Sequence, residues 1–170
     1  MNRMKHATAC SMAVLALAAC SKKPPESLPP APSAVSQASS PAPQTSGVMP
    51  GSQAEFRATM SGRDTIYFDT DQYNIDGEDT ASLRTQAEWL ARYPQKRAVV
   101  EGHADERGTR DYNLALGERR ANSARNYLVS LGIEDSRLTV VSYGEERPAN
   151  VGADAAAWAQ NRRAVTVTID

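Results

Sequence analysis

The sequence predicts a single α/β domain, a sheet with helices packed on it, over residues 54–170. Segments rich in β-forming residues alternate there with segments of helical apolar spacing, in the order β-α-β-α-β-α-β. A chain of 170 residues has room for one ordinary domain of roughly 100 to 150 residues. Both cysteines lie within the first twenty residues, so the domain has to be stabilised by its hydrophobic core without a disulfide.

Four short runs are expected to form the strands. Each is rich in β-branched or aromatic residues and is bounded by turn-forming or charged residues. The runs cover residues 65–68, 98–101, 138–143 and 164–169.

Three helices are expected between these strands. Asp76 is suited to cap the first, which ends where Tyr93 precedes a proline. The second covers about residues 109–131 and stops at Gly132, a residue type common just after helix ends. A short alanine-rich helix that ends near Trp158 comes before the last strand.

Residues 1–19 have the composition of a secretory signal peptide. Arg3 and Lys5 precede a short apolar run that ends in small residues. A bilayer-spanning helix needs about 20 apolar residues, and this run is shorter. We therefore expect the segment to be cleaved.

The end of this segment, Leu17-Ala18-Ala19-Cys20, resembles the lipobox of bacterial lipoproteins. The resemblance implies that Cys20 receives a diacylglycerol and becomes the new N-terminus, and acyl chains in this number hold a protein stably on a bilayer. Ser21 resembles the residue after the cysteine in outer-membrane lipoproteins. We expect a lipid anchor in the outer membrane, with the domain facing the periplasm. The alternative is an ordinary signal peptide with an incidental cysteine, as Cys10 is.

Residues 20–53 form the predicted tether, which begins with the lipidated cysteine. Eight of the ten prolines of the chain lie within residues 21–50, among serine, alanine and glutamine. Such a segment cannot bury enough apolar surface to offset the entropy of ordering, so we expect it to be disordered and extended. Nothing in the sequence contradicts the alternative of a generic spacer with no role beyond its length.

The charge balance argues against nucleic-acid binding. The whole chain has 19 lysines and arginines and 20 aspartates and glutamates, and cleavage after residue 19 removes Arg3 and Lys5. The remainder is therefore net negative, whereas phosphate binding needs clustered positive charge.

One charged residue does not fit the helical pattern. Arg120 falls on the inward face of the helix predicted at 109–131, four residues after Leu116 and four before Ala124. A charge out of water needs a partner, and Asp105 in the glycine-bounded loop before this helix is the expected one. Together with the positive N-terminus of the helix, the two side chains suit a zwitterionic ligand. The alternative is that they pair with each other and only close the core.

The residues around this pair resemble a known family. VEGHADERGT at residues 100–109 and LGERRAN at residues 116–122 are similar to the peptidoglycan-associated lipoproteins, whose folded part is an OmpA-like domain. Supporting stretches lie at residues 67–69, 141–144 and 161–164, and the similarity covers roughly residues 63–170. The resemblance implies an OmpA-like sandwich with a mixed four-stranded sheet.

The resemblance also implies roles for individual residues. In this family the aspartate and arginine that match Asp105 and Arg120 hold the amino and carboxylate groups of diaminopimelate in uncrosslinked peptidoglycan stems. An arginine fork takes a carboxylate through two hydrogen bonds, and an aspartate accepts from an ammonium. Asp69 matches a loop that borders this ligand, with turn or cap chemistry as its alternative role.

Two further residues complete the predicted site. His103 stands at a strand end beside it, although a lone histidine is more often structural than a ligand. Arg163, chosen over its neighbour Arg162, is expected to brace the site or contact the stem peptide. The alternative for Arg163 is a solvated or structural charge.

The sequence therefore predicts a binding protein rather than an enzyme, with no cofactor or metal. Residues 21–170 have one histidine, no cysteine and no His-Glu-x-x-His motif, so neither a nucleophile with its base nor a metal site is apparent. The rival class is a cell-wall hydrolase. The family implies TolB and other Tol proteins as partners in envelope integrity and cell division. An OmpA-like lipoprotein that anchors the cell wall outside the Tol system is the alternative.

Overall fold

The structure, a computed structural model, describes residues 48–169. The predicted signal peptide, Cys20 and most of the predicted tether lie outside this range. The elements are α1 (Gln53–Met60), β1 (Thr65–Tyr67), α2 (Gly77–Arg92), β2 (Arg97–His103), α3 (Arg110–Ser130), the 3-10 turn η1 (Asp135–Arg137), β3 (Leu138–Gly144), α4 (Ala155–Asn161) and β4 (Arg163–Ile169). The predicted α/β fold with four strands is confirmed, and α1 is an additional helix that the sequence did not predict.

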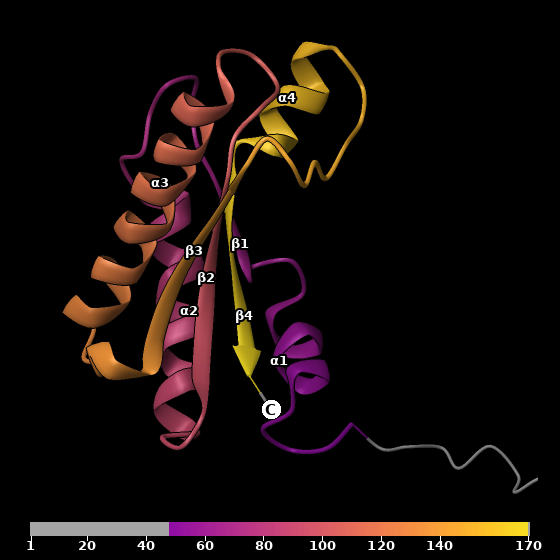
Figure 1. The fold of residues 1–170 in the computed structure, drawn as a ribbon. Helices are drawn as coiled ribbons and strands as arrows, with labels where there is room; N and C mark the ends of the chain where they lie inside the picture. Colours follow the sequence, from indigo (N-terminus) through magenta and orange to yellow (C-terminus); the bar gives the residue numbers. More distant parts are fainter. Residues whose placement is uncertain (1–47, 170) are drawn as a thin grey trace, which may run out of the picture. The chain divides into compact units, whose positions relative to one another are not determined.

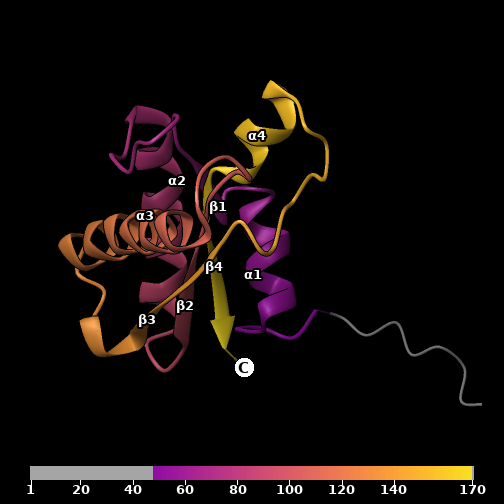
Figure 2. The ribbon, with the colours of Figure 1, turned by 45° about the horizontal axis from the view of Figure 1, so that its top comes forward.

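The sheet is mixed, with strand order β1-β4-β2-β3. β4 is antiparallel to both β1 and β2, whereas β2 and β3 are parallel and are joined through α3. α2 and α3 lie on the same face of the sheet (Figures 1 and 2). β2 and β3 finish, and β4 starts, at the end of the sheet that is uppermost in Figure 1, beside α4. We call this the upper end of the sheet.

The helices begin and end where local chemistry predicts. The Asp76 side chain caps α2 by accepting a hydrogen bond of 2.8 Å from the backbone N–H of Asp79. After α3, Gly132 adopts a φ of 95°, and the N–H of Ile133 donates to the carbonyl of Leu128 at 3.2 Å. This is a Schellman ending, which satisfies carbonyls that the helix leaves open. The buried face of this helix ends before Leu131, which is 38% exposed.

α1 packs against α2 through aromatic side chains. The Phe56 ring lies 4.9 Å from the Trp89 ring in an edge-to-face arrangement, and both residues are buried. The Ser52 hydroxyl caps the helix by accepting from the N–H of Glu55 at 3.2 Å. The apolar core therefore begins with this helix, ahead of the first strand.

A close contact between two glycines holds α3 against β2. A Cβ atom added to Gly102 would lie only 1.8 Å from the carbonyl oxygen of Gly117. The helix backbone therefore approaches the strand more closely than any side chain would allow. Within residues 48–169 no helix is both long enough and apolar enough to cross a bilayer.

Candidate functional site

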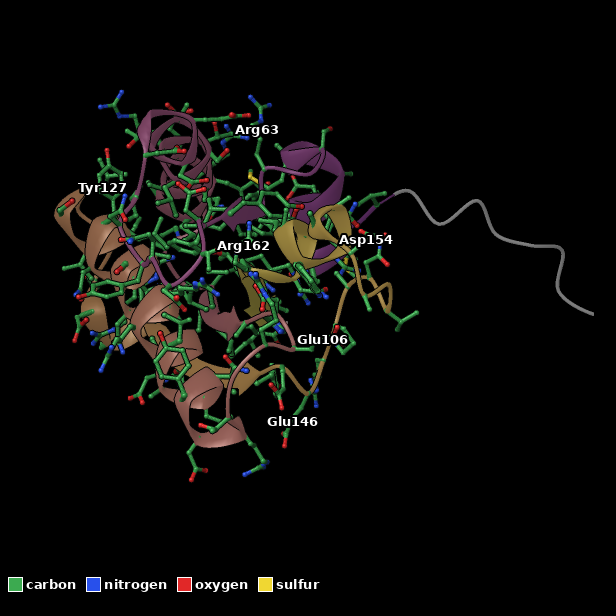
Figure 3. The ribbon with its side chains drawn as sticks, turned by 90° about the horizontal axis from the view of Figure 1, so that it is seen from above. Arg63, Glu106, Tyr127, Glu146, Asp154 and Arg162 are labelled. Atoms are coloured by element: carbon green, nitrogen blue, oxygen red, sulfur yellow. The ribbon has the colours of Figure 1, made fainter. Side chains whose placement is uncertain are left out.

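The predicted site lies at the upper end of the sheet, where three chain segments meet. These are the loop that follows β2, the loop between β1 and α2, and the junction of α4 with β4. Figure 3 looks down on this end, with Arg162 toward its middle and Glu106 and Glu146 on loops farther out. The loops position side chains that a rigid sheet and α3 support from below.

Arg120 is fully buried, as its place on the helix predicted, but no carboxylate within residues 48–169 pairs with it. Its guanidinium donates to three backbone carbonyls: Nε to Gln72 at 2.9 Å, Nη1 to His103 at 2.8 Å and Nη2 to Asp69 at 3.1 Å. A guanidinium has five N–H groups. One N–H on each terminal nitrogen therefore has no acceptor among the residues that the structure describes.

Asp105 is also buried, at 6% exposure, and it pairs within its own loop. Arg107 donates to both of its oxygens, through Nε at 2.9 Å and Nη2 at 2.7 Å, and the backbone N–H of Arg107 adds a bond of 3.1 Å. Arg162 Nη1 lies 3.4 Å from the same carboxylate. The prediction that Asp105 neutralises Arg120 was wrong, because Arg107 reaches this carboxylate from only two residues away.

The two residues keep opposite charges at neutral pH. Burial lowers the pKa of Arg120 to about 10, with a smaller contribution from Arg162, while the charge of Asp105 acts in the opposite direction. Burial alone would raise the pKa of Asp105, but the hydrogen bonds from Arg107 and Arg162 outweigh it and hold the pKa below its ordinary value. The site therefore contains a fixed cation and a fixed anion, each with separate partners.

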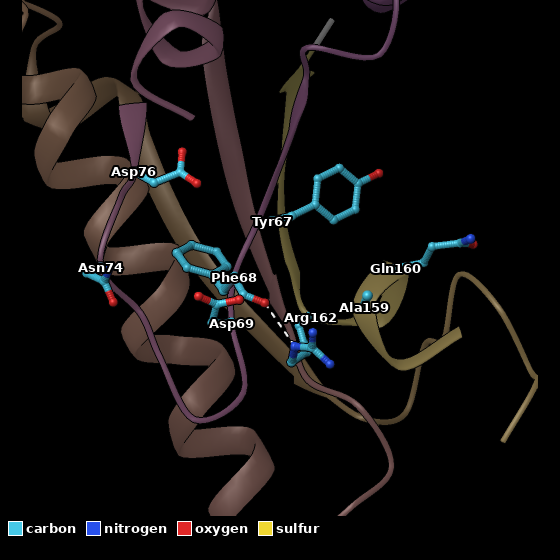
Figure 4. Close-up of a pocket in the computed structure, with 8 residues that line it drawn as sticks. All are labelled: Tyr67, Phe68, Asp69, Asn74, Asp76, Ala159, Gln160 and Arg162. Atoms are coloured by element: carbon cyan, nitrogen blue, oxygen red, sulfur yellow. Dashed lines mark hydrogen bonds between the residues drawn. The ribbon is translucent and has the colours of Figure 1, made fainter. Parts of the chain in front are cut away.

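Asp69 lines a cavity of about 310 Å³ next to these residues (Figure 4). Arg162 lines the same cavity and donates through Nε to the carbonyl of Phe68 at 2.9 Å. Neither Asp105 nor Arg120 lines it. Since Arg162 also contacts Asp105, and the Asp69 carbonyl contacts Arg120, these two residues join the cavity to the buried charges.

The structure does not bring the side chain of His103 to this group. The preceding residue, Gly102, faces α3, and alternate residues of a strand face opposite sides, so the imidazole lies on the other face of the sheet. It is 2% exposed, and its ring lies 5.6 Å from that of Tyr143. Burial and then the charges of Arg163 and Arg147 lower its pKa to about 4. Only its backbone carbonyl belongs to the site.

Arg163 lies on the same far side of the sheet. Its guanidinium donates to the carbonyls of Asn161 at 3.4 Å and Arg147 at 3.1 Å, and burial lowers its pKa. Ligand contacts by this side chain and by the imidazole of His103 stay predictions.

Two arginines of the site were not among the predicted residues. Arg107 follows Asp105 by two positions, and this spacing in a tight loop was a usable signal. Arg162 was set aside in favour of Arg163, although counting back by two from the core residue Ala164 places position 162 on the core side. The period of the strand therefore distinguishes the two neighbours.

The fold and the site define a domain with fixed charges of both signs at one end of a mixed sheet, a construction suited to binding a small charged ligand. Residues 67–162 match the OmpA family, and the chain belongs to that family.

Similar proteins carry consistent names. A peptidoglycan-associated lipoprotein of Rhizobium meliloti is 54% identical over 118 residues, which are 69% of this chain and 66% of that protein. The chain thus matches just under two thirds of the length of that relative. One from Mesorhizobium japonicum is 56% identical over 117 residues, covering 69% and 68% of the two chains. These relatives are named as lipoproteins and not as enzymes.

Solved structures agree on the fold. The peptidoglycan-associated lipoprotein of Burkholderia pseudomallei has a TM-score of 0.60 and 44% identity, covering 62% of this chain and 89% of that one. The cell wall anchor of the type VI secretion system (T6SS) from Pseudomonas aeruginosa has a TM-score of 0.57 at 24% identity, covering 72% of this chain and all of that one. The second likeness concerns the fold alone.

Proposed function

We propose that this protein binds the diaminopimelate end of peptidoglycan stem peptides, without cleaving them, and so ties the cell envelope to the wall. The observation that carries the proposal is the state of Arg120, a buried cation that has two unused N–H groups and no carboxylate partner in the described part of the chain. Leaving donors of a buried charge unused is costly unless a ligand takes them up. A ligand carboxylate is the matching acceptor.

Diaminopimelate meets both charges of the site. Its distal carboxylate would approach Arg120 by replacing a carbonyl of the loop at Asp69 and Gln72, because the guanidinium has no exposed surface. Its distal ammonium would be held by Asp105, whose pKa keeps it ionised. The cavity beside Asp69 and Arg162 gives room for the rest of the stem peptide. Lysine at the same stem position would lack the carboxylate and leave Arg120 unchanged.

We extend the proposal to the cell. Lipid on Cys20 would anchor the chain in the outer membrane, the segment of residues 20–53 would cover the distance to the wall, and the domain would face the periplasm. The resemblance to peptidoglycan-associated lipoproteins supports a place in the Tol system, with TolB as partner in envelope integrity and division. The names of the relatives support the association with peptidoglycan.

A pull-down with isolated sacculi tests the binding. Asp105→Asn removes the anionic partner of the ligand ammonium, and we expect at least about tenfold less protein on the sacculi, since a charge-assisted bond is lost. Glu146→Gln is the matched control, because the Glu146 side chain pairs with exposed Arg110 at 2.6 Å and, within the described residues, bonds to neither Asp105 nor Arg120. Retention of Asp105→Asn at the level of the control would contradict the proposal.

Two further measurements support the pull-down. Circular-dichroism melts should show that both variants are folded, which separates lost binding from lost structure. Zymography on peptidoglycan should give no lytic band, and a clear band would identify a hydrolase instead.

A further inference from the structure

Arg107 occupies the place at Asp105 that the proposed function reserves for a ligand cation. Its guanidinium donates two parallel hydrogen bonds to the carboxylate, the arrangement that binds an arginine most tightly to an acid. The carboxylate is 7% exposed at its side chain, and the arginine is 41% exposed. The acid is therefore fixed in the protein, while the cation that covers it stands at the surface.

Arg107 also has a second set of partners on its outer side. Its guanidinium carbon lies 4.4 Å from the centre of the Trp158 ring, within cation–π distance, and its Nη2 donates to the Thr70 hydroxyl at 3.3 Å. The Trp158 ring is itself held, because its Nε1 donates to Glu106 at 3.1 Å. If Arg107 leaves Asp105, its guanidinium can therefore still contact the Trp158 ring and the Thr70 hydroxyl.

We propose that Arg107 is an affinity-determining residue of the site, an internal competitor that a ligand must move from Asp105 onto Trp158. This inference rests on the proposed function. A tethered guanidinium competes at high effective concentration, so a single ligand amine displaces it poorly. A ligand that also brings a carboxylate gains the two unused N–H groups of Arg120, which offsets the displacement. The competition thus lowers the affinity for both kinds of tip by a similar factor, and only tips that carry both charges recover the loss through Arg120.

Calorimetry on the full chain with two synthetic peptides tests this. One peptide is L-alanyl-γ-D-glutamyl-meso-diaminopimelate, and the other has L-lysine in the last position. Arg107→Gln keeps a polar side chain, although a shorter one, and removes the competing charge. We expect this variant to bind the diaminopimelate peptide roughly three- to tenfold more tightly than the wild type does, because the ligand no longer has to break a partly exposed ion pair. The lysine peptide should gain affinity by a similar factor, because both peptides have to displace the same guanidinium.

Arg110→Gln is the matched control, since it removes the same charge from an exposed pair with Glu146 and should change neither affinity more than about twofold.

A carbon-13 titration of Asp105 without ligand gives an independent readout. In Arg107→Gln its pKa should rise, because burial then acts with less opposition. Arg107→Lys keeps the charge but loses the planar fork. It should bind the diaminopimelate peptide more tightly than the wild type does, and it tests the inference if Arg107→Gln folds poorly.

The outcomes separate the two proposals. If the wild type binds the diaminopimelate peptide and Arg107→Gln binds it equally or less well, Arg107 is a ligand contact or a structural residue and the inference is overturned. If neither binds, the proposed function fails, and the competitor role fails with it. An unchanged pKa of Asp105 in Arg107→Gln also overturns the inference, because it means that Arg107 does not hold this carboxylate in solution.

Discussion

Replacing Gly102 by alanine should destabilise the domain strongly. The added Cβ would lie 1.8 Å from the carbonyl oxygen and 2.5 Å from the carbonyl carbon of Gly117, and both atoms belong to the backbone of α3. No rotamer change relieves this overlap, so the helix has to move away from β2 by more than about 1 Å, beyond ordinary van der Waals adjustment. Overpacking costs typically about 1 to 3 kcal/mol, and a backbone clash belongs at or above the upper end. For a domain of this size, about 3 kcal/mol lowers Tm by roughly 10 to 15 °C.

The same displacement should weaken ligand binding. Arg120 is close to one helical turn beyond Gly117, and its Nη1 reaches the carbonyl of His103, the residue after Gly102, at 2.8 Å. Moving α3 outward stretches this bond and shifts the buried guanidinium. We expect sacculi to retain less of the Gly102→Ala protein than of the wild type, at a temperature at which both proteins are folded.

Thermal and urea unfolding followed by circular dichroism measure the stability effect. Gly77→Ala is the control, because a Cβ at this first residue of α2 would meet no atom within 4 Å. It should leave stability unchanged or raise it by up to about 1 kcal/mol. A Gly102→Ala protein that melts within a degree or two of the wild type would refute the reasoning from close packing. So would an equal loss in the control.

Two buried acid–base groups give predictions for pH. Burial, the largest cause, raises the pKa of Asp79 from 3.8 to about 6, and its Oδ2 has no hydrogen-bond partner among residues 48–169. The stability contributed by this group is therefore full below about pH 4 and falls as pH rises through 6. Asp79→Asn keeps an acceptor for the N–H of Tyr67 and should add about 2 to 3 kcal/mol to the unfolding free energy at pH 7.5 but little at pH 4; equal effects at both pH values would count against this. For His103 the sign is opposite: its pKa falls from 6.5 to about 4, so stability is full above about pH 6.5 and is lost toward pH 4. The free energy of unfolding, measured by urea titration, should fall between pH 7 and pH 4.5 by about 2 to 3 kcal/mol less in His103→Phe than in the wild type. An equal fall in both proteins would contradict the lowered pKa of His103.

Local rules account for the elements that could be predicted. Asp76 is a residue type that caps the start of a helix, and Gly132 is one that follows the end of a helix. Apolar residues recur at helical spacing within α2 and α3, so the start of α2 and the end of α3 could be predicted from the sequence. The missed helix α1 also had a local signal. Ser52 and Glu55 stand at capping-box spacing, but the helix has only eight residues and follows a proline-rich stretch. Its stability comes from Phe56 packing on Trp89, a contact between residues 33 positions apart, which no local pattern reveals.

What the linear order of residues determined is which side chains are buried and at which end of the domain they gather. Helical period places Arg120 inward, and the chain order β2, loop, α3 places Asp105 at the start of the same helix. Which atoms these charges contact was decided only in three dimensions. Arg120 donates to carbonyls of Asp69 and Gln72, about fifty positions away, and Asp105 accepts from Arg107 and Arg162. Hydrogen bonds depend on distances of tenths of an ångström, which residue spacing does not specify but the packing of a folded backbone does.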